Sequence, residues 1–207
     1  MRQLFAPSQA SNVVGDAIDA LSPWLYLHPD DLPATVLANG EAWPNRGSQA
    51  DWQLAPLGSD GTVADYLGWP SLTVANFGWN DVSSPNYPNA TVAFVADMPG
   101  INRFDLGPWN FFSTIGVNAV PNYHLQAVDR GVAPAAQTHR LVTALRQGTA
   151  ASGIWEDGVK VATLNSINMT GSQGWRRVQA RPLTSLMIFP PETDPADVVA
   201  AVEEVFS

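Results

Sequence analysis

Carboxylates are the first side chains to consider for chemistry, because cleavage of a glycosidic bond uses two of them about 5 to 9.5 Å apart. On one strand, such a pair requires acidic residues two or four positions apart. The glutamates do not form this pattern; they are Glu41, Glu156, Glu192, Glu203 and Glu204. Most aspartates fall in predicted turns, where Asx-turns and caps account for them. The sequence therefore predicts no catalytic dyad within one element, although turn aspartates from distant segments could still meet in the fold.

Other catalytic motifs are also missing from the sequence. It contains no Gly-x-Ser-x-Gly elbow, no His-Glu-x-x-His and no phosphate-binding glycine loop. His28, His124 and His139 lie far apart, and His139 opens a predicted strand, where a hydrogen-bonding role is commoner than catalysis. Cysteine is absent, which excludes disulfides, thiolate nucleophiles and Cys-based zinc sites. We therefore predict that the chain is not an enzyme.

Aromatic residues beside turn residues are the candidate binding groups. Several of the eight tryptophans stand next to Gly, Pro or Asn, as Trp79 and Trp109 do. A loop tryptophan can stack on a sugar ring; for any single tryptophan, packing into the core is the commoner role. The candidate glycan site combines loop aromatics with amide and carboxylate neighbours: Trp79, Asn80, Asp81, Tyr87 and Trp109. Trp155 and Trp175 are assigned to the protein core instead.

The elements that would position these residues are mainly strands. The segment Gln137 to Thr163 predicts a strand from His139 to Leu145 and a hairpin whose type I′ turn is Asp157-Gly158. This turn pairs Glu156 with Val159, Trp155 with Lys160 and Ile154 with Val161. Residues 90–97 form a strand with apolar residues on both faces, which predicts a central strand covered on both sides or one that lines a cleft.

Further short strands are predicted at residues 24–27, 70–77, 110–117, 123–128, 175–179 and 184–189. Residues 1–22 form an arm or a short helix that Ser11 or Asn12 could cap. A C-terminal helix begins at Pro195, after a cap at Thr193 or Asp194, and its apolar stripe comprises Val198, Val199, Val202, Val205 and Phe206. The pattern predicts an all-β domain over residues 23–207, which includes this helix.

Composition limits the partners. A chain of 207 residues with 45% hydrophobic and 14% charged residues suits one sandwich domain. The net charge of −9 would repel nucleic acid and anionic membranes, so neither is an expected partner. No apolar run is long enough to cross a membrane, and the N-terminus lacks the features of a signal peptide. We expect synthesis in the cytoplasm without export by that route.

The order of these motifs resembles the concanavalin A-like, laminin-G-type jelly-roll domains of bacteriophage minor tail and surface-adhesion proteins. The resemblance covers residues 23–207. It is carried by the turn Trp43-Pro44-Asn45-Arg46-Gly47-Ser48, the strand Thr91 to Val95, the Asp157-Gly158 hairpin and the opening run Trp24 to Asp30. It implies a concanavalin-like jelly-roll β-sandwich with an N-terminal arm or short helix and a C-terminal helix.

The resemblance also implies a function. The chain would be a non-catalytic, lectin-like component of a virion, a phage minor tail or tail-tip protein that contacts host surface glycan or cell-wall polysaccharide alongside other virion proteins. The alternative is a structural virion subunit that uses the sandwich for protein contacts. Calcium is a candidate cofactor, with oxygen donors at Asn80 and Asp81 and at Asp97, Asn102 and Asp105. The ordinary preference of Asn and Asp for loops explains these residues as well.

Overall fold

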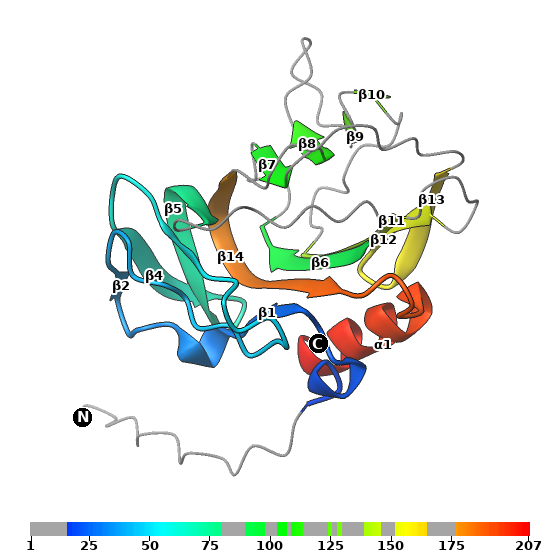
Figure 1. The fold of residues 1–207 in the computed structure, drawn as a ribbon, viewed down its shortest axis with the longest axis horizontal. Coiled ribbons are helices and arrows are strands. Elements are labelled where there is room, and N and C mark those ends of the chain that lie inside the picture. The colour runs from blue at the N-terminus through cyan, green and yellow to red at the C-terminus, as the bar shows by residue number, and fades with distance from the viewer. Residues whose placement is uncertain are drawn as a thin grey trace.

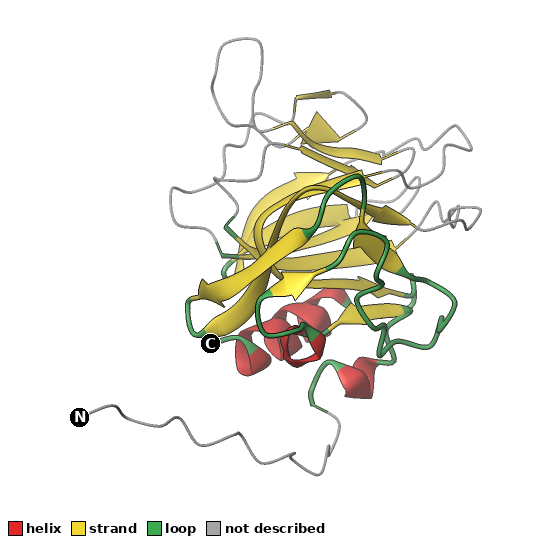
Figure 2. Cartoon of the chain, turned by 90° about the vertical axis from the view of Figure 1, so that its left-hand side faces the viewer, coloured by secondary structure: helices red, strands yellow, loops and turns green. Residues whose placement is uncertain are grey.

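The computed structural model describes residues 16–79, 90–97, 103–106, 109–113, 124–125, 128–129, 139–145, 152–164 and 177–207. Within these residues, twelve strands join in one strongly bent antiparallel sheet, and a C-terminal helix lies against it (Figure 1). The all-β sandwich predicted from the sequence is confirmed. Figure 2 shows the helices gathered on one side of the strands.

The strands are β1 (Leu25–Leu27), β2 (Val36–Leu37), β3 (Leu54–Pro56), β4 (Gly61–Tyr66), β5 (Trp69–Trp79), β6 (Ala90–Ala96), β7 (Arg103–Leu106), β8 (Trp109–Ser113), β9 (His124–Leu125), β10 (Val128–Asp129), β11 (Arg140–Leu145), β12 (Ser152–Glu156), β13 (Val159–Leu164) and β14 (Arg177–Phe189). The helices are η1 (Asp19–Leu21), η2 (Pro29–Asp31) and α1 (Pro195–Val205). The single strand predicted at residues 123–128 is wrong. Two short strands, β9 and β10, stand there and pair with each other.

Strand β14 links the two halves of the sandwich. In its first half, Val178 pairs with Phe77 of β5, and in its second half Leu186 pairs with Phe94 of β6. The register shifts several times between these halves, and such bulges bend a strand and let it pass from one layer to the other. The sequence analysis predicted two separate strands, 175–179 and 184–189. In the described residues they are parts of one continuous strand, Arg177–Phe189, so this prediction is wrong. Pro182 lies at a register shift, where its missing N–H breaks no ladder hydrogen bond.

Two apolar clusters lie on opposite faces of the layer that contains β6. The inner cluster lies between the layers and includes Trp43, Phe77 and Phe94. The outer cluster joins Ala93, Val95, Val142, Met187 and Phe189 to Ile18 and to Val198, Ala201, Val202 and Phe206 of the C-terminal segment. Every residue of β6 is buried. Of the two alternatives predicted for this strand, a cover on both sides or a face that lines a cleft, the burial pattern supports the first.

The hairpin β12–β13 follows the predicted turn but not the whole predicted register. Asp157 and Gly158 have φ angles of 42° and 82°, as a type I′ turn requires. Glu156 pairs with Val159 and Trp155 with Lys160 as expected, but Ile154 pairs with Ala162 because a bulge precedes Trp155. A turn motif fixes the first pairs of a hairpin, whereas a bulge further along is set by packing.

The C-terminal helix begins as predicted. Asp194 is its N-cap and accepts a hydrogen bond from the backbone N–H of Ala196, and Pro195 opens the first turn. Val198 and Val202 are fully buried against the sheet, while Val199 and Val205 are half-buried at the edges of the contact. Among the described residues, no helix is both long enough and apolar enough to cross a membrane.

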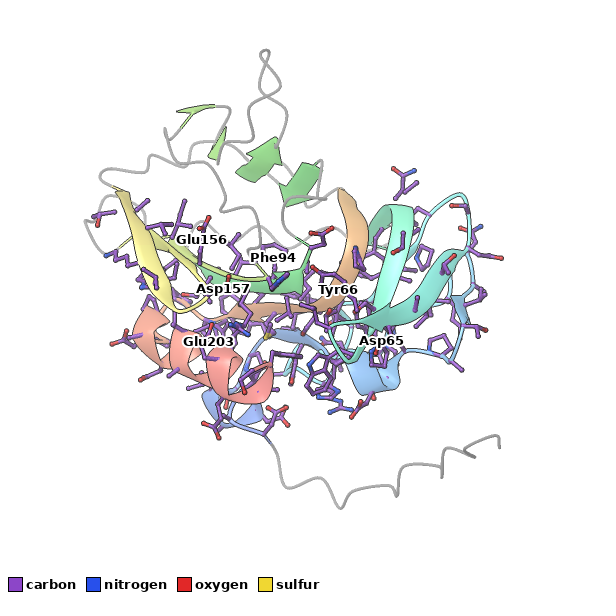
Figure 3. All side chains as sticks on the ribbon, turned by 180° about the vertical axis from the view of Figure 1, so that it is seen from behind. Asp65, Tyr66, Phe94, Glu156, Asp157 and Glu203 are labelled. Carbon is purple, nitrogen blue, oxygen red and sulfur yellow. The ribbon has the colours of Figure 1, made fainter. Side chains whose placement is uncertain are left out.

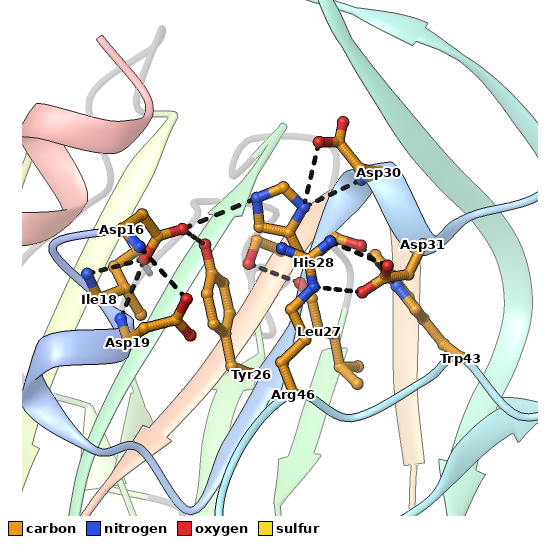
Figure 4. Close-up of polar contacts among 11 residues, drawn as sticks. Asp16, Ile18, Asp19, Tyr26, Leu27, His28, Asp30, Asp31, Trp43 and Arg46 are labelled. Carbon is orange, nitrogen blue, oxygen red and sulfur yellow. Dashed lines mark hydrogen bonds and ion pairs between the residues drawn. The ribbon is translucent and has the colours of Figure 1, made fainter. Parts of the chain in front are cut away.

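A polar network attaches the N-terminal segment to the sheet (Figure 4). The buried Tyr26 hydroxyl donates to Asp16 at 2.7 Å, and Arg46 binds Asp31 through two hydrogen bonds of 2.6 and 2.9 Å. His28, 6% exposed, lies beside Asp16 with Nε2 3.8 Å from the carboxylate. Burial, and then the positive charge of Arg46, lower the pKa of His28 from 6.5. Burial and the hydrogen bond to Asp16 raise the pKa of Tyr26 above its usual range.

The motif Trp43 to Ser48 completes this end of the sandwich. The Asn45 side chain accepts hydrogen bonds from the backbone N–H groups of Tyr26 and Gly47, and the Trp43 indole donates to the His28 carbonyl at 2.9 Å. A Cβ on Gly47 would lie 2.5 Å from the Trp24 carbonyl oxygen. Glycine is therefore required here by close backbone approach. Predicted caps at Ser11 and Asn12 lie outside the described residues.

Candidate functional site

A small aromatic pocket opens where three elements meet: the tip of the β4–β5 hairpin, the start of β11 and the end of α1. Its volume is about 130 Å³. Its aromatic, polar and charged lining residues, together with one exposed leucine, are Tyr66, Leu67, Trp69, His139, Arg140 and Phe206. Val95, Thr184 and Ser207 complete the lining. A semi-enclosed hollow with aromatic walls and a few polar groups has the composition of a small-molecule site.

The β4–β5 hairpin holds the aromatic wall. Tyr66 pairs with Trp69 across a two-residue turn, Leu67-Gly68, with φ angles of 55° and 88°. Trp69 packs edge-to-face on Phe206 with 5.3 Å between ring centroids, which links the hairpin to the end of α1. Leu67 is 60% exposed at the rim. A leucine at positive φ is an uncommon and strained choice for this kind of turn, where Asn, Asp or Gly usually stands.

The polar edge of the pocket is formed by Tyr66 and His139. The Tyr66 hydroxyl lies 2.9 Å from Nδ1 of His139, and the two rings are nearly perpendicular at 71°. Burial, followed by the negative charge of Asp97 and a hydrogen bond to it, raises the pKa of Tyr66 to about 12. The phenol is therefore neutral at physiological pH, and its oxygen can both donate and accept hydrogen bonds.

Arg140 is the guanidinium at the pocket, and acidic partners surround it. Its Nε lies 2.8 Å from Glu203 of α1 and 3.5 Å from Asp157, and its Nη1 donates to the Phe206 carbonyl at 3.0 Å. Asp157 also accepts from the backbone N–H groups of His139 and Arg140. Figure 3 shows Asp157 on the hairpin turn, above Glu203 of the helix. Both carboxylates thus fix the geometry of β11 against α1.

Buried hydroxyls lie beneath the aromatic wall. The Ser71 hydroxyl lies 2.7 Å from that of Thr184, and it also donates to the Trp69 carbonyl at 3.1 Å. Both residues are about 1% exposed. This pairing satisfies polar groups that would otherwise be costly to bury, and it joins β5 to β14 directly under Trp69.

A second hollow of about 390 Å³ lies at the other end of α1, and it is much more open. Trp155 and Lys160 form one side of it, and residues 191–196 form the other. The ammonium group of Lys160 stands 5.1 Å from the centre of the Trp155 ring. Because the lysine already covers an aromatic face, this hollow offers less stacking surface than the pocket at Tyr66.

The sequence-predicted site lies largely outside the described residues. Asn80, Asp81 and Tyr87 fall outside them, and for Trp79 and Trp109 the structure gives the backbone positions alone, at the end of β5 and the start of β8. Trp79 pairs with Leu54 and Trp109 with Leu106. This set, and the assignment of Trp175 to the core, stay predictions. Trp155 packs against the outer cluster but is only partly buried.

The calcium donors proposed from the sequence are also only partly described. Asn80, Asp81 and Asn102 lie outside the described residues, and Asp105 is placed by its backbone in β7. Among the residues that the structure describes, no three His, Asp or Glu side chains form a group that could hold a metal ion. Calcium binding by the loops that contain Asn80 and Asn102 stays a prediction.

Sequence reasoning did not identify the pocket at Tyr66. Its lining comes from residues 66–69, 95, 139–140, 184 and 206–207, which no local motif connects. The available signals were weak: a tryptophan beside a Gly in Leu67-Gly68-Trp69, and a histidine that opens a strand.

Comparison with known proteins gives likeness of fold. No known family model matches the chain, and no curated protein sequence matches it. Domain 4 of AbnA, an extracellular family 43 arabinanase from Geobacillus stearothermophilus solved in complex with arabinotriose, has a similar structure, with a TM-score of 0.57 and 10% identity over 87% of this chain and 98% of that domain. A sialidase from Trypanosoma rangeli gives a TM-score of 0.44 and 10% identity over 98% of this chain and 36% of that one. The chain thus shares the β-sandwich fold of a domain that has been solved with a bound oligosaccharide.

Proposed function

We propose that the protein is a non-catalytic carbohydrate-binding module and that the pocket at Tyr66 is its sugar site. The observation that carries the proposal is the presence, in one semi-enclosed hollow, of a tryptophan side chain beside hydrogen-bonding groups. A sugar ring has an apolar C–H face and a polar rim of hydroxyls. Trp69 suits the face, and the hydroxyl of Tyr66 and the imidazole of His139 suit the rim.

The fold comparison supports the same reading. Domain 4 of AbnA was solved with arabinotriose, so a sandwich of this shape can carry an oligosaccharide. At 10% identity, this likeness concerns the fold. The sugar itself is therefore left open, and arabino-oligosaccharides are one probe among several.

The absence of catalysis is part of the proposal. Beside the pocket, Asp157 and Glu203 hold Arg140 and the start of β11. A retaining or inverting glycosidase instead needs two carboxylates that face the scissile bond from opposite sides. The check is incubation of each bound glycan with the protein at micromolar concentration. Release of reducing ends above the rate of a Tyr66→Phe variant would contradict the proposal.

The first test is a glycan array that includes arabinotriose and bacterial cell-wall polysaccharides, probed with and without a calcium chelator. We expect saturable, chelator-insensitive binding to one glycan class. Binding that disappears on chelation would move the site to the predicted calcium loops near Asn80 and Asn102. Absence of saturable binding to any glycan, in either condition, would overturn the proposed function.

Variants then separate the two candidate sites. Tyr66→Phe deletes one hydroxyl without changing the wall, and loss of one hydrogen bond should weaken binding about three- to tenfold. Trp69→Ala removes the stacking face and should reduce binding further, by about tenfold or more. Trp79→Ala and Trp109→Ala test the site predicted from the sequence. If these two abolish binding while Tyr66→Phe has no effect, the sugar site lies in the loops and not at Tyr66.

The particle context stays a prediction from the sequence. We propose the tail or tail tip of a phage as the setting, where the module would contact host surface glycan. The alternative of a structural virion subunit predicts that deletion of the N-terminal arm, residues 1–22, abolishes incorporation into the particle. It also predicts that the full-length protein binds no glycan measurably.

A further inference from the structure

We infer that the pocket at Tyr66 selects a single uncharged sugar ring at the end of a glycan and rejects uronic and sialic acids. The inference rests on the proposed function, because it names the class of sugar that the same pocket takes. It follows from the balance of charges around the pocket and from its size.

Carboxylates outnumber free cations at the pocket. Asp157 and Glu203 both contact Arg140, whose side chain is 22% exposed. Asp97 helps to raise the pKa of the Tyr66 hydroxyl, and Asp65 accepts a hydrogen bond from the backbone N–H of Gly68 at the turn. Among the described residues that line the pocket, Arg140 supplies the guanidinium, and the carboxylates of Asp157 and Glu203 offset its charge. An anionic ligand would therefore meet an excess of negative charge around the guanidinium.

The engagement of Arg140 is geometric as well as electrostatic. Its Nε points at Glu203 at 2.8 Å and its Nη1 at the Phe206 carbonyl at 3.0 Å. A carboxylate ligand is bound best by two parallel N–H groups of one guanidinium. A side-on fork uses Nε and Nη2, so Arg140 could offer it only by breaking the contact with Glu203, which helps to hold the end of α1 against β11.

The volume of the pocket limits the ligand to one ring. The volume of about 130 Å³ is well below the roughly 300–1,000 Å³ of sites for drug-sized ligands. Leu67 narrows the rim, where its exposed side chain extends from the strained turn. An internal residue of a chain needs two exits, whereas a terminal residue needs one. The pocket accordingly fits the end of a chain.

The experiment starts from the strongest ligand on the array, whatever its identity. That glycan is oxidised at its primary alcohols to the corresponding uronate, and both forms are titrated by calorimetry. We expect the neutral form to bind at least about tenfold more tightly than the uronate. An anionic glycan as the strongest ligand, or equal binding of both forms, would overturn the inference while leaving sugar binding intact. A blank array would instead remove the proposed function.

Glu203→Gln provides a gain-of-binding test with a matched control. Loss of this partner leaves the charge of Arg140 less balanced. The ratio of the Kd of the uronate to the Kd of the neutral glycan should therefore fall about two- to fivefold. Glu204→Gln makes the same change in net charge at the exposed neighbour on α1 and should leave the preference unchanged. Equal narrowing in both variants would show a general charge effect and would overturn the role of the Arg140–Glu203 pair.

A second experiment varies the length of the glycan to test whether the pocket takes one terminal ring. If one terminal ring fills the pocket, the affinity of a disaccharide and of longer homologues should agree within about threefold, because added residues lie outside the hollow. Affinity that rises more than tenfold from the disaccharide to the tetrasaccharide would place several rings on the protein. That result would overturn the terminal-ring assignment.

Discussion

Tryptophan has different roles at different positions in this chain, and burial separates them. Trp43 is 0% exposed, contacts Phe77 and donates its indole N–H to the His28 carbonyl. Trp155 is partly buried, and Lys160 covers one face of it. Trp43→Ala should lower the free energy of unfolding by about 3 to 5 kcal/mol, since it leaves a cavity and removes one of the two hydrogen bonds to the His28 carbonyl. Trp155→Ala should cost about 1 to 2 kcal/mol because its site is open to solvent.

Urea unfolding at pH 7, followed by circular dichroism, measures both changes. Trp43→Phe is the intermediate case, because it keeps an aromatic ring and loses the hydrogen bond. Equal losses for Trp43→Ala and Trp155→Ala would contradict the assignment of Trp43 to the inner cluster. The sequence could predict that most tryptophans pack in the core, but it could not rank them, because burial depends on strands far apart in the chain.

The two hairpins show how far local sequence determines an element. Asp157-Gly158 was predicted because both residues adopt positive φ readily, and the structure confirms the turn. The turn Leu67-Gly68 was not predicted, although it has the same geometry, because leucine is disfavoured at positive φ. Its conformation is imposed by pairing of β4 with β5 and by packing of Trp69 on Phe206. The pocket therefore depends on a turn that no local sequence motif predicts.

Leu67 is both strained and exposed, so we expect it to contribute to binding rather than to stability. Leu67→Asn should raise the free energy of unfolding by about 0.5 to 1 kcal/mol, because Asn tolerates the left-handed conformation better. The same change should weaken glycan binding, because it removes the apolar rim. Val159→Thr, at another exposed apolar position, should change stability by less than about 0.5 kcal/mol and leave binding unaltered. A Leu67→Asn variant that binds as tightly as the original protein would assign the leucine no role in the site.

At the scale of the whole molecule, fold class was predictable and layer assembly was not. Alternating short strands and turns indicated an all-β sandwich, and the capping motif located α1. The bent path of β14, which joins β5 to β6, depends on pairings more than 80 positions apart in the chain, such as Val178 with Phe77 and Ile188 with Val92. That path brings Thr184 beneath Trp69 and places α1 across the outer face. The pocket is a product of this assembly, which explains why motif-based reasoning placed the sugar site elsewhere.

The attachment of the N-terminal segment to the sheet should make the stability of the molecule depend on pH. His28 is buried beside Asp16, and its lowered pKa means that the native protein resists taking up a proton. The unfolded chain binds that proton below the ordinary value of 6.5. Since the unfolded state then holds more protons than the native state, stability falls as pH decreases through 6.5 toward the lower native pKa.

We therefore expect a lower Tm at pH 5.5 than at pH 7.5 for the original protein. His28→Asn retains an acceptor for the backbone N–H of Asp30, which His28 Nδ1 accepts at 3.1 Å, and it cannot be protonated. This variant should lose part of the pH dependence while its melting temperature at pH 7.5 changes little. Differential scanning calorimetry at half-unit steps between pH 5.5 and 7.5, above the range in which most carboxylates titrate, isolates the histidine contribution. Parallel curves for the two proteins would show that acid sensitivity arises elsewhere, and His28 would then be only a packing residue of the Asp16–Tyr26 network.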